Sequence, residues 1–451
     1  MVTSSDRFWW GVATSAFQIE GTSSDAPRGE SVWDEFCRRP GAVADGSDAS
    51  VATDHVRRVE EDVALIAGLG VDAYRFSISW PRVVPGGRGP ASSAGLAFYD
   101  RLVDALLASG VEPLPTLFHW DTPLELERSG GWLERDTAQR FAAYVEVVAD
   151  HLGDRVGHWI TINEPREVTM LGYALGTHAP GRQLLFDALP SAHHQLLGHG
   201  LAVQALRAAG ARSVGIAMSH ETVRSTGLSD DDRAAADLYD VLNNRLFADP
   251  VLLGRYPDGF ADLMPGPVED DLTVISTPVD WYGVNYYSPA FVGAHTGQGG
   301  DVNGITMPDE LPFTVHDVHP GWTGERTDFG WPVAPEDLTE LLVQMRTRYG
   351  PSLPPVVITE NGCSFDDPLV DGRIQDDRRI DFLRRHLDAV EDARSLGVDV
   401  RGYVVWTLID NFEWAEGYRQ KFGLVHVDRE TLDRTPRASY DWYAEHVRSS
   451  R

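Results

Sequence analysis

The chain has 451 residues, of which 42% are hydrophobic, and its formal net charge at pH 7 is -29. The acidic residues are spread along the chain, so they predict a solvated surface and disfavour binding to nucleic acid or to an anionic membrane, which requires clustered Lys and Arg. Two cysteines, Cys37 and Cys363, are too few for a disulfide framework.

The chain begins with a stretch, Met1 to Phe17, that lacks the basic and apolar regions of a secretory leader. No run elsewhere approaches the roughly 20 apolar residues that span a bilayer. We therefore expect a cytoplasmic protein with no membrane partner.

Short apolar runs then alternate with amphipathic patterns, which is typical of a parallel sheet built from strand and helix pairs. Strands are predicted at Phe8 to Glu20, Ala73 to Trp80, Glu112 to Trp120, His158 to Glu164, Val214 to Met218, Trp281 to Tyr287, Val356 to Glu360 and Gly402 to Trp406. Helices are predicted at Asp54 to Leu69, Gly95 to Ala108, Ala138 to His151, Ala192 to Ala209, Pro335 to Tyr349 and Asp376 to Leu396. Several helices are followed by a glycine that can end them, namely Gly70, Gly110, Gly210 and Gly397.

This unbroken alternation favours an α/β fold, a single (β/α)8 TIM barrel over residues 1–451, with extended loops after the strands. An open dinucleotide-binding sheet is disfavoured because no Gly-x-Gly-x-x-Gly follows the first strand. Residues 293–327, from Gly293 to Thr327, are rich in Gly, Pro, Asp and His, and they predict a long loop at the mouth of a site.

Polar and aromatic residues stand where most of the predicted strands end. They are Gln18 and Glu20, Arg75, His119 and Trp120, Asn163 and Glu164, Asn285 and Tyr287, Glu360 and Asn361, and Trp406. Any one of them alone could cap a helix or satisfy a loop carbonyl. In a barrel, however, these ends converge on one rim, where the catalytic groups of such barrels lie.

Two carboxyl groups at this rim suit the cleavage of a glycosidic bond, which needs one protonated acid and one ionised carboxylate. Arg75 and Tyr287 are candidates to hold Glu360 ionised, whereas Glu164 has the neutral Asn163 beside it and can keep a raised pKa. We therefore assign Glu164 as general acid/base and Glu360 as nucleophile.

Two motifs around these glutamates resemble those of glycoside hydrolase family 1, namely Thr161-Ile162-Asn163-Glu164-Pro165 and Ile358-Thr359-Glu360-Asn361-Gly362. Further segments resemble the family in the same order along the chain. These are Trp10 to Gly21, Tyr74 to Arg82, His119-Trp120-Asp121 and Asn411-Phe412-Glu413-Trp414. The similarity covers essentially the whole chain.

The resemblance implies roles for the matching positions. It implies that the terminal sugar is bound by Gln18, His119, Asn163, Trp406 and Glu413, in a pocket also lined by Trp120, Trp414 and Phe422. It places Arg75 and Tyr287 against the nucleophile, with Asn285 and Arg166 in supporting positions. It also implies no cofactor and no metal, and His193, His194 and His199 lack the spacing of a metal site.

The implied activity is hydrolysis of terminal β-D-glucosyl, β-D-galactosyl or β-D-fucosyl units with retention of configuration, in a small β-glucoside or an oligosaccharide. Glu413 and Trp414 stand where members that act on phosphorylated sugars have a Ser-containing stretch, so an unphosphorylated sugar is favoured. A transglycosidase with the same residues and a carbohydrate-binding pseudoenzyme are the alternatives. The sequence leaves open whether the protein forms a homo-oligomer.

The sequence departs from the family on the side of the leaving group, the aglycone. Arg166 follows the motif proline where the family commonly has Trp, and Asp121-Thr122-Pro123-Leu124 replaces the usual Asp-Leu-Pro-Gln. Arg166 either contacts a polar or acidic aglycone or pairs internally with an acid such as Glu167 or Glu221.

Overall fold

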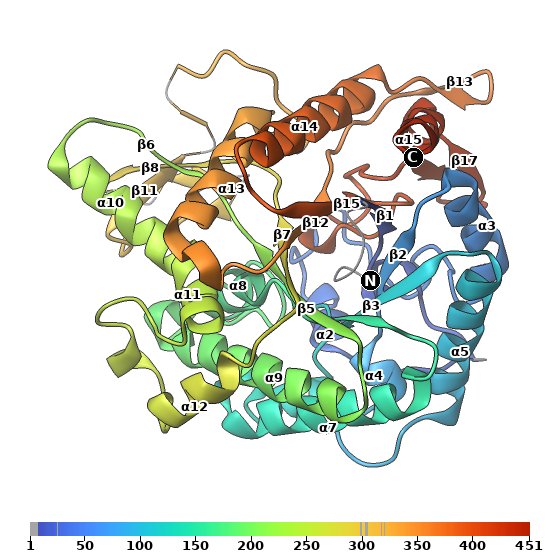
Figure 1. Ribbon diagram of the computed structural model, residues 1–451, viewed down its shortest axis with the longest axis horizontal. Coiled ribbons are helices and arrows are strands. Elements are labelled where there is room, and N and C mark those ends of the chain that lie inside the picture. The colour runs from blue at the N-terminus through green and yellow to red at the C-terminus, as the bar shows by residue number, and fades with distance from the viewer. Residues whose placement is uncertain (1–7, 25, 298–299, 303–304, 317, 320) are drawn as a thin grey trace.

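The computed structural model describes residues 8–451 except 25, 298–299, 303–304, 317 and 320. Residues 1–7, part of the stretch examined for a leader, lie outside the described residues. Parallel strands close into a barrel in the order β1-β15-β12-β7-β5-β4-β3-β2 (Figure 1). They are β1 (Trp9–Ala13), β2 (Ala73–Ser77), β3 (Glu112–Phe118), β4 (His158–Asn163), β5 (Ser213–Ser219), β7 (Trp281–Asn285), β12 (Val356–Asn361) and β15 (Val400–Trp406). The predicted (β/α)8 barrel is confirmed.

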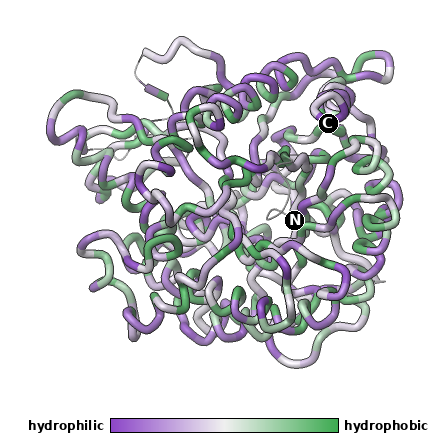
Figure 2. The backbone as a smooth tube through the Cα atoms, viewed as in Figure 1, coloured by the Kyte–Doolittle hydropathy of each residue, from purple (hydrophilic) through white to green (hydrophobic). Residues whose placement is uncertain are grey.

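Helices surround the barrel. The longer ones are α3 (Val59–Leu69), α5 (Ser93–Ala108), α7 (Arg135–Leu152), α9 (Leu189–Ala208), α10 (Asp230–Asp240), α11 (Leu246–Leu253), α12 (Val268–Ile275), α13 (Pro335–Tyr349), α14 (Asp377–Ser395) and α15 (Ala438–Ser449). Figure 2 shows hydrophobic and hydrophilic residues alternating along this outer ring, as expected for helices with one face on a core and one in water. Within the described part of the chain, no helix combines the length and apolarity needed to cross a membrane.

Shorter helical turns lie in the connections and build much of the rim. They are α1 (Ala16–Ile19), α2 (Val32–Cys37), α4 (Trp80–Val83), α6 (Leu124–Glu127) and α8 (Pro165–Glu167), the π-helical turns η2 (Val168–Ala174) and η4 (Val241–Arg245), and the 3-10 turns η1 (Gly131–Leu133), η3 (Leu185–Ala188), η5 (Ala261–Leu263), η6 (Gly350–Ser352) and η7 (Trp414–Glu416).

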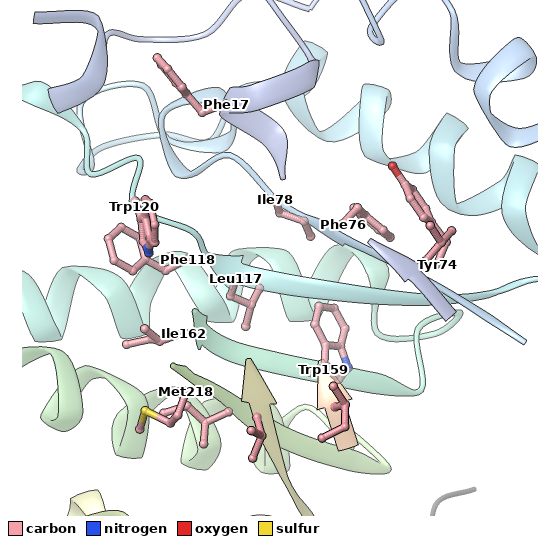
Figure 3. Close-up of a cluster of buried hydrophobic side chains, with 14 of the residues drawn as sticks. Phe17, Tyr74, Phe76, Ile78, Leu117, Phe118, Trp120, Trp159, Ile162 and Met218 are labelled. Carbon is pink, nitrogen blue, oxygen red and sulfur yellow. The ribbon is translucent and has the colours of Figure 1, made fainter. Parts of the chain in front are cut away.

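Side chains on the barrel strands alternate between two cores. On β2, Ala73 belongs to an inner cluster that contains Ala13 and Ala217, whereas Tyr74 and Phe76 belong to the large outer cluster between strands and helices. Figure 3 shows part of the outer cluster, with Tyr74 and Phe76 drawn beside residues of β3, β4 and β5. This two-residue period turns the third residue of β2, Arg75, into the barrel, where small neighbours leave room for it.

The glycines expected to end helices do so. Gly70, Gly110, Gly210 and Gly397 have φ angles of 72°, 75°, 86° and 88°, a left-handed conformation that glycine adopts without strain. The expected start of the first long helix at Asp54 is wrong: α3 begins at Val59, because the backbone turns at Asp54, where φ is 56°.

Two other expectations need correction. The strand predicted for Phe8 to Glu20 ends at Ala13, and Gln18 lies instead on the helical turn α1, because the hydrophobic residues of this stretch continue past the end of the strand. Residues 293–327 are less irregular than expected, because β8 (Ala290–Ala294) pairs with β11 (Phe313–His316) and with β6 (Val223–Ser225) in a sheet outside the barrel. Within this stretch, residues 298–299, 303–304, 317 and 320 lie outside the described residues.

The small sheet has its own core. Together with α10 it buries a third cluster that includes Tyr239, Leu242, Val292, Phe313 and Val315. In Figure 1, α10 and these strands lie together beyond the ring of barrel strands. The remaining short strands are β9 (Asp301–Val302), β10 (Ile305–Thr306), β13 (Leu369–Val370), β14 (Arg373–Ile374), β16 (Val425–Val427) and β17 (Arg434–Pro436).

Candidate active site

A cavity of about 340 Å³ lies at the carboxyl ends of the barrel strands. Its lining includes ten of the residues predicted from the sequence: His119, Trp120, Glu164, Arg166, Tyr287, Glu360, Trp406, Glu413, Trp414 and Phe422. The other predicted residues, Gln18, Arg75, Asn163 and Asn285, are buried and lie behind this wall, hydrogen-bonded to the residues that form it. The structure thus gathers the predicted residues in two shells, one facing the cavity and one supporting it.

Glu360, on β12, is held at both carboxylate oxygens. Arg75 donates from Nη1 to Oε1 at 2.5 Å, and the Tyr287 hydroxyl donates to Oε2 at 2.7 Å. Arg75 also donates from Nη2 to Asn163 Oδ1 at 2.6 Å, so its guanidinium is fixed from two sides. Charge-assisted contacts of this kind orient a carboxylate and favour its ionised form. The expected partners of Glu360 are therefore in place.

Glu164 follows β4 directly and has a left-handed backbone, with φ at 46°. Such a conformation is strained in a residue with a side chain and persists only where the surroundings enforce it. Asn285 donates from Nδ2 to Glu164 Oε1 at 2.8 Å, and Asn163 donates from Nδ2 to Oε2 at 3.3 Å. The donors to Glu164 are thus neutral amides, in contrast to the cation that contacts Glu360.

Both glutamates are buried, but their surroundings shift the two pKa values to different extents. Burial raises the pKa of Glu164 well above its usual range, and the negative charges of Glu360 and Glu167 add to the rise. Burial also raises the pKa of Glu360, but Arg75 and the Tyr287 hydroxyl oppose that rise. Glu164 therefore holds its proton to a higher pH than Glu360 does. This is the division that an acid and a nucleophile require.

Gln18 and Glu413 form a polar pair at one end of the cavity. Gln18 donates from Nε2 to Glu413 Oε2 at 3.3 Å and to the carbonyl of Phe412 at 2.9 Å. Burial, with the charge of Glu360, raises the pKa of Glu413 to about 8. A largely protonated Glu413 can both donate and accept hydrogen bonds, as a vicinal pair of sugar hydroxyls requires.

Aromatic rings surround the same end of the cavity. His119 stacks on Trp406 and on Trp414, with ring centroids 5.8 and 5.9 Å apart, and Trp120 lies 4.5 Å from Trp414. Asn163 donates from Nδ2 to His119 Nε2 at 3.1 Å, while Nδ1 of His119 has no partner among the described residues. Since burial lowers the pKa of His119 well below its usual range, the ring is neutral and Nδ1 carries the proton.

Arg166 lines the cavity beyond Glu164 but is bound by acids of the chain itself. It donates from Nε to Glu167 Oε1 at 2.8 Å and from Nη1 to Glu221 Oε2 at 2.8 Å. Its side chain is only 12% exposed. Of the two interpretations left open by the sequence, the internal ion pair is the one that the structure contains.

Several cavity residues were not individually predicted from the sequence, although some of them belong to the stretch 293–327 that was expected at the mouth of a site. They include Met170, His178, Leu311, Phe313, Val315, Phe329 and Trp331. Most of them come from the π-helical turn η2 or from the long segment after β7, where no strand end marks them. Trp331 stacks on Phe329 at 4.2 Å and contacts Tyr287 at 5.3 Å, and an aromatic pair separated by one glycine was the only available signal.

The three histidines considered for a metal serve the core of the protein. His193 contacts the hydroxyl of Tyr256 and the carboxylate of Asp271, and His199 contacts the hydroxyl of Thr161. His194 hydrogen-bonds the carbonyl of Trp132. They belong to α9 and do not line the cavity.

Comparison with known proteins places this geometry in a family. A thermostable β-glucosidase B of Thermobispora bispora is 44% identical, with 98% of this chain and 90% of the relative covered. A bifunctional β-D-glucosidase/β-D-fucosidase of Bifidobacterium breve is 40% identical over 98% of this chain and 97% of the relative. The crystal structure of a psychrophilic β-glucosidase from Micrococcus antarcticus superposes with a TM-score of 0.92 at 44% identity and covers 98% of this chain and 97% of its own. The family model of glycosyl hydrolase family 1 matches residues 3–451, and the chain belongs to this family.

Proposed function

We propose that the chain is a retaining β-glucosidase that hydrolyses terminal, unphosphorylated β-D-glucosyl residues by double displacement. The observation that carries the proposal is the pair of buried glutamates in one cavity, with a cation and a phenol on Glu360 and neutral amides on Glu164. We propose further that the whole chain acts as one catalytic domain. A cytoplasmic location and a homo-oligomer stay predictions from the sequence.

In the first step, the carboxylate of Glu360 attacks the anomeric carbon while the bond from that carbon to the leaving oxygen breaks. The proton of Glu164 moves to the leaving oxygen, so the aglycone departs as a neutral alcohol. A covalent glucosyl ester on Glu360 and an ionised Glu164 result. Arg75 and Tyr287 hold Glu360 in place for the attack.

In the second step, the ionised Glu164 takes a proton from water as the water oxygen attacks the anomeric carbon. The ester bond breaks, glucose leaves with its β configuration, and Glu360 is again a carboxylate while Glu164 is again an acid. An alcohol in place of water gives a transferred glycoside by the same route, which is the transglycosidase alternative.

The polar end of the cavity supports the choice of sugar. Glu413 and His119 offer hydrogen bonds to hydroxyl groups, Gln18 holds Glu413 from behind, and Trp406 offers a flat apolar face. Glu413 lines the cavity where family members that act on phosphorylated sugars have a Ser-containing stretch, which favours an unphosphorylated sugar. One relative is named for both glucosidase and fucosidase activity, and this supports tolerance for fucosyl units.

Hydrolysis of 4-nitrophenyl β-D-glucoside tests the proposal. We expect release of nitrophenol and of glucose in equal amounts, with β-glucose as the first product seen by proton NMR. Release of α-glucose first would exclude retention. Nitrophenol without free glucose would indicate a transglycosidase, and no turnover at all would favour the pseudoenzyme.

A further inference from the structure

The cavity continues past Glu164 into a mouth whose walls are mostly apolar. Met170 and Leu175 face it from η2 and the residue after it, Phe313 and Val315 face it from β11 of the sheet outside the barrel, and Leu311 faces it from the bend before β11. Because Glu164 protonates the leaving oxygen in the proposed function, this mouth is where the aglycone must lie. Apolar walls of this kind bind apolar groups by removing them from water.

Polar residues interrupt these walls, and four of them, Arg166, Glu167, Glu221 and Tyr239, form a hydrogen-bonded cluster. Glu221 accepts from Arg166 at 2.8 Å and from the hydroxyl of Tyr239 at 3.1 Å, both at Oε2. Arg166 and Glu167 are 12% and 10% exposed, and Glu221 is 20% exposed. A group that binds in the mouth therefore lies close to charges that water screens only in part.

The cluster holds one cation and two anions. Burial works to lower the pKa of Arg166, but the carboxylates of Glu167 and Glu221 outweigh it, so the guanidinium stays charged. Burial also lowers the pKa of the neighbouring His220 to about 4, which leaves that ring neutral. The cluster thus contains two acidic side chains and one guanidinium, even though Arg166 is the charged residue nearest to Glu164 in the sequence.

Glu221 is fixed in this position by its backbone. Its N–H donates to Asn244 Oδ1 at 3.1 Å, and Asn244 donates from Nδ2 to the carbonyl of Glu221 at 2.9 Å. Asn244 lies in the π-helical turn η4, which follows α10. Asn244 therefore fixes the backbone of Glu221, and the side chain is held by Arg166 and Tyr239.

We infer that this mouth selects uncharged, largely apolar leaving alcohols and rejects anionic ones, and that Glu221 sets the charge preference by neutralising Arg166. The inference rests on the proposed function. An acidic aglycone would have to displace Glu221 or Glu167 from the guanidinium, or lie unpaired beside them. A neutral aromatic or alkyl aglycone neither has to displace an acid from Arg166 nor places an unpaired charge beside one.

The test compares 4-carboxyphenyl β-D-glucoside with 4-carbamoylphenyl β-D-glucoside, which have nearly the same shape and differ by one charge. The measured quantity is the ratio of kcat/KM for the amide to kcat/KM for the acid, in the wild type and in variants. Glu221→Gln should lower this ratio by roughly three- to thirtyfold, because one anion is lost and Arg166 gains a free edge. Arg166→Gln should raise it, because two acids then stand without their cation. The intrinsic reactivity of the two phenols cancels in the comparison between variants.

Asp231→Asn is the matched control, since it removes the same charge from an exposed position on α10 outside the cavity. It should leave the ratio unchanged. A ratio that is equal in wild type and Glu221→Gln, or a wild-type preference for the acid, would overturn the inference. Loss of turnover of both glucosides in the wild type would instead overturn the proposed function.

A second pair tests the apolar walls without any charge. Octyl and methyl β-D-glucoside have leaving alcohols of similar acidity, so their difference reports binding of the chain. We expect kcat/KM to be at least about tenfold higher for the octyl compound, given the gain for each buried methylene group. Equal values would show that the walls do not bind the aglycone.

Discussion

Asn285 holds Glu164 in place: its Nδ2 donates to Glu164 Oε1 at 2.8 Å, while its Oδ1 accepts from the hydroxyl of Thr359, the neighbour of Glu360, at 2.6 Å. The same Nδ2 also donates to Asn163 Oδ1 at 2.9 Å. One side chain on β7 thereby connects β4 and β12, the two strands that carry the glutamates.

This connection predicts a shift in the pH profile. The contact from Asn285 stabilises the ionised form of Glu164 and so lowers its pKa. Asn285→Ala should therefore raise the pKa of Glu164 and move the alkaline limb of kcat/KM to higher pH, while kcat falls by roughly ten- to a hundredfold because the acid is less well positioned. Asn243→Ala, at another position of the cavity lining, should leave the alkaline limb in place. A limb that moves to lower pH would contradict the assigned hydrogen bond.

Removal of the nucleophile should be rescued by a small anion. Glu360→Ala should lose hydrolysis of aryl glucosides by at least about 10⁴-fold, because no other carboxylate is assigned to attack the anomeric carbon. Azide should restore part of the turnover and give the α-glucosyl azide, since it attacks once from the vacated side. Near-normal activity without azide would refute the role of Glu360.

In a crystal structure of the wild type, the two carboxyl groups should lie about 5 to 5.5 Å apart.

Removal of the acid should depend on the leaving group. In Glu164→Ala, the first step should survive for 2,4-dinitrophenyl β-D-glucoside, whose phenolate leaves without a proton, and should be lost for methyl β-D-glucoside. Stopped-flow measurement should show a burst of dinitrophenol followed by slow turnover, because the ester then lacks its general base. Equal losses for both substrates would argue that Glu164 only positions the sugar.

Gly362 should be intolerant of any side chain. A Cβ at this position would lie 1.7 Å from the carbonyl oxygen of Trp406, which is backbone and cannot rotate away. Gly362→Ala should lower the free energy of unfolding by about 3 kcal/mol or more and distort the neighbouring nucleophile strand. Gly86→Ala, where the nearest atom would be 3.9 Å away, is the control and should unfold at nearly the wild-type temperature. Thermal unfolding followed by circular dichroism checks both variants.

The sequence could predict that Glu164 and Glu360 meet in one cavity, because each stands at the end of a strand and in a motif of its own. The predicted ranges for the barrel strands overlap those observed, and Arg75 reaches Glu360 as expected. Gln18 was expected on a strand but lies on the helical turn α1, because hydrophobic residues continue past the end of β1.

The mouth could not be predicted in the same way. Phe313 and Val315 line it only because β11 pairs with β8, and β8 with β6, across a long stretch of chain with weak strand patterns. The fate of Arg166 was equally open, since its partner Glu221 is 55 residues away and nothing local selects it over an aglycone. Pairings across such separations depend on the tertiary fold.

The position of the small sheet separates the residues proposed for catalysis from residues that line the mouth. Glu360, Arg75 and Asn285 lie on barrel strands, whereas α10 and β11, which line one wall of the mouth, do not belong to the barrel. That wall has its own hydrophobic cluster, so its residues can be exchanged without repacking the strands that hold Arg75 and Asn285. Substitutions in this peripheral segment can therefore change which leaving groups are accepted, while the residues proposed for the reaction stay the same.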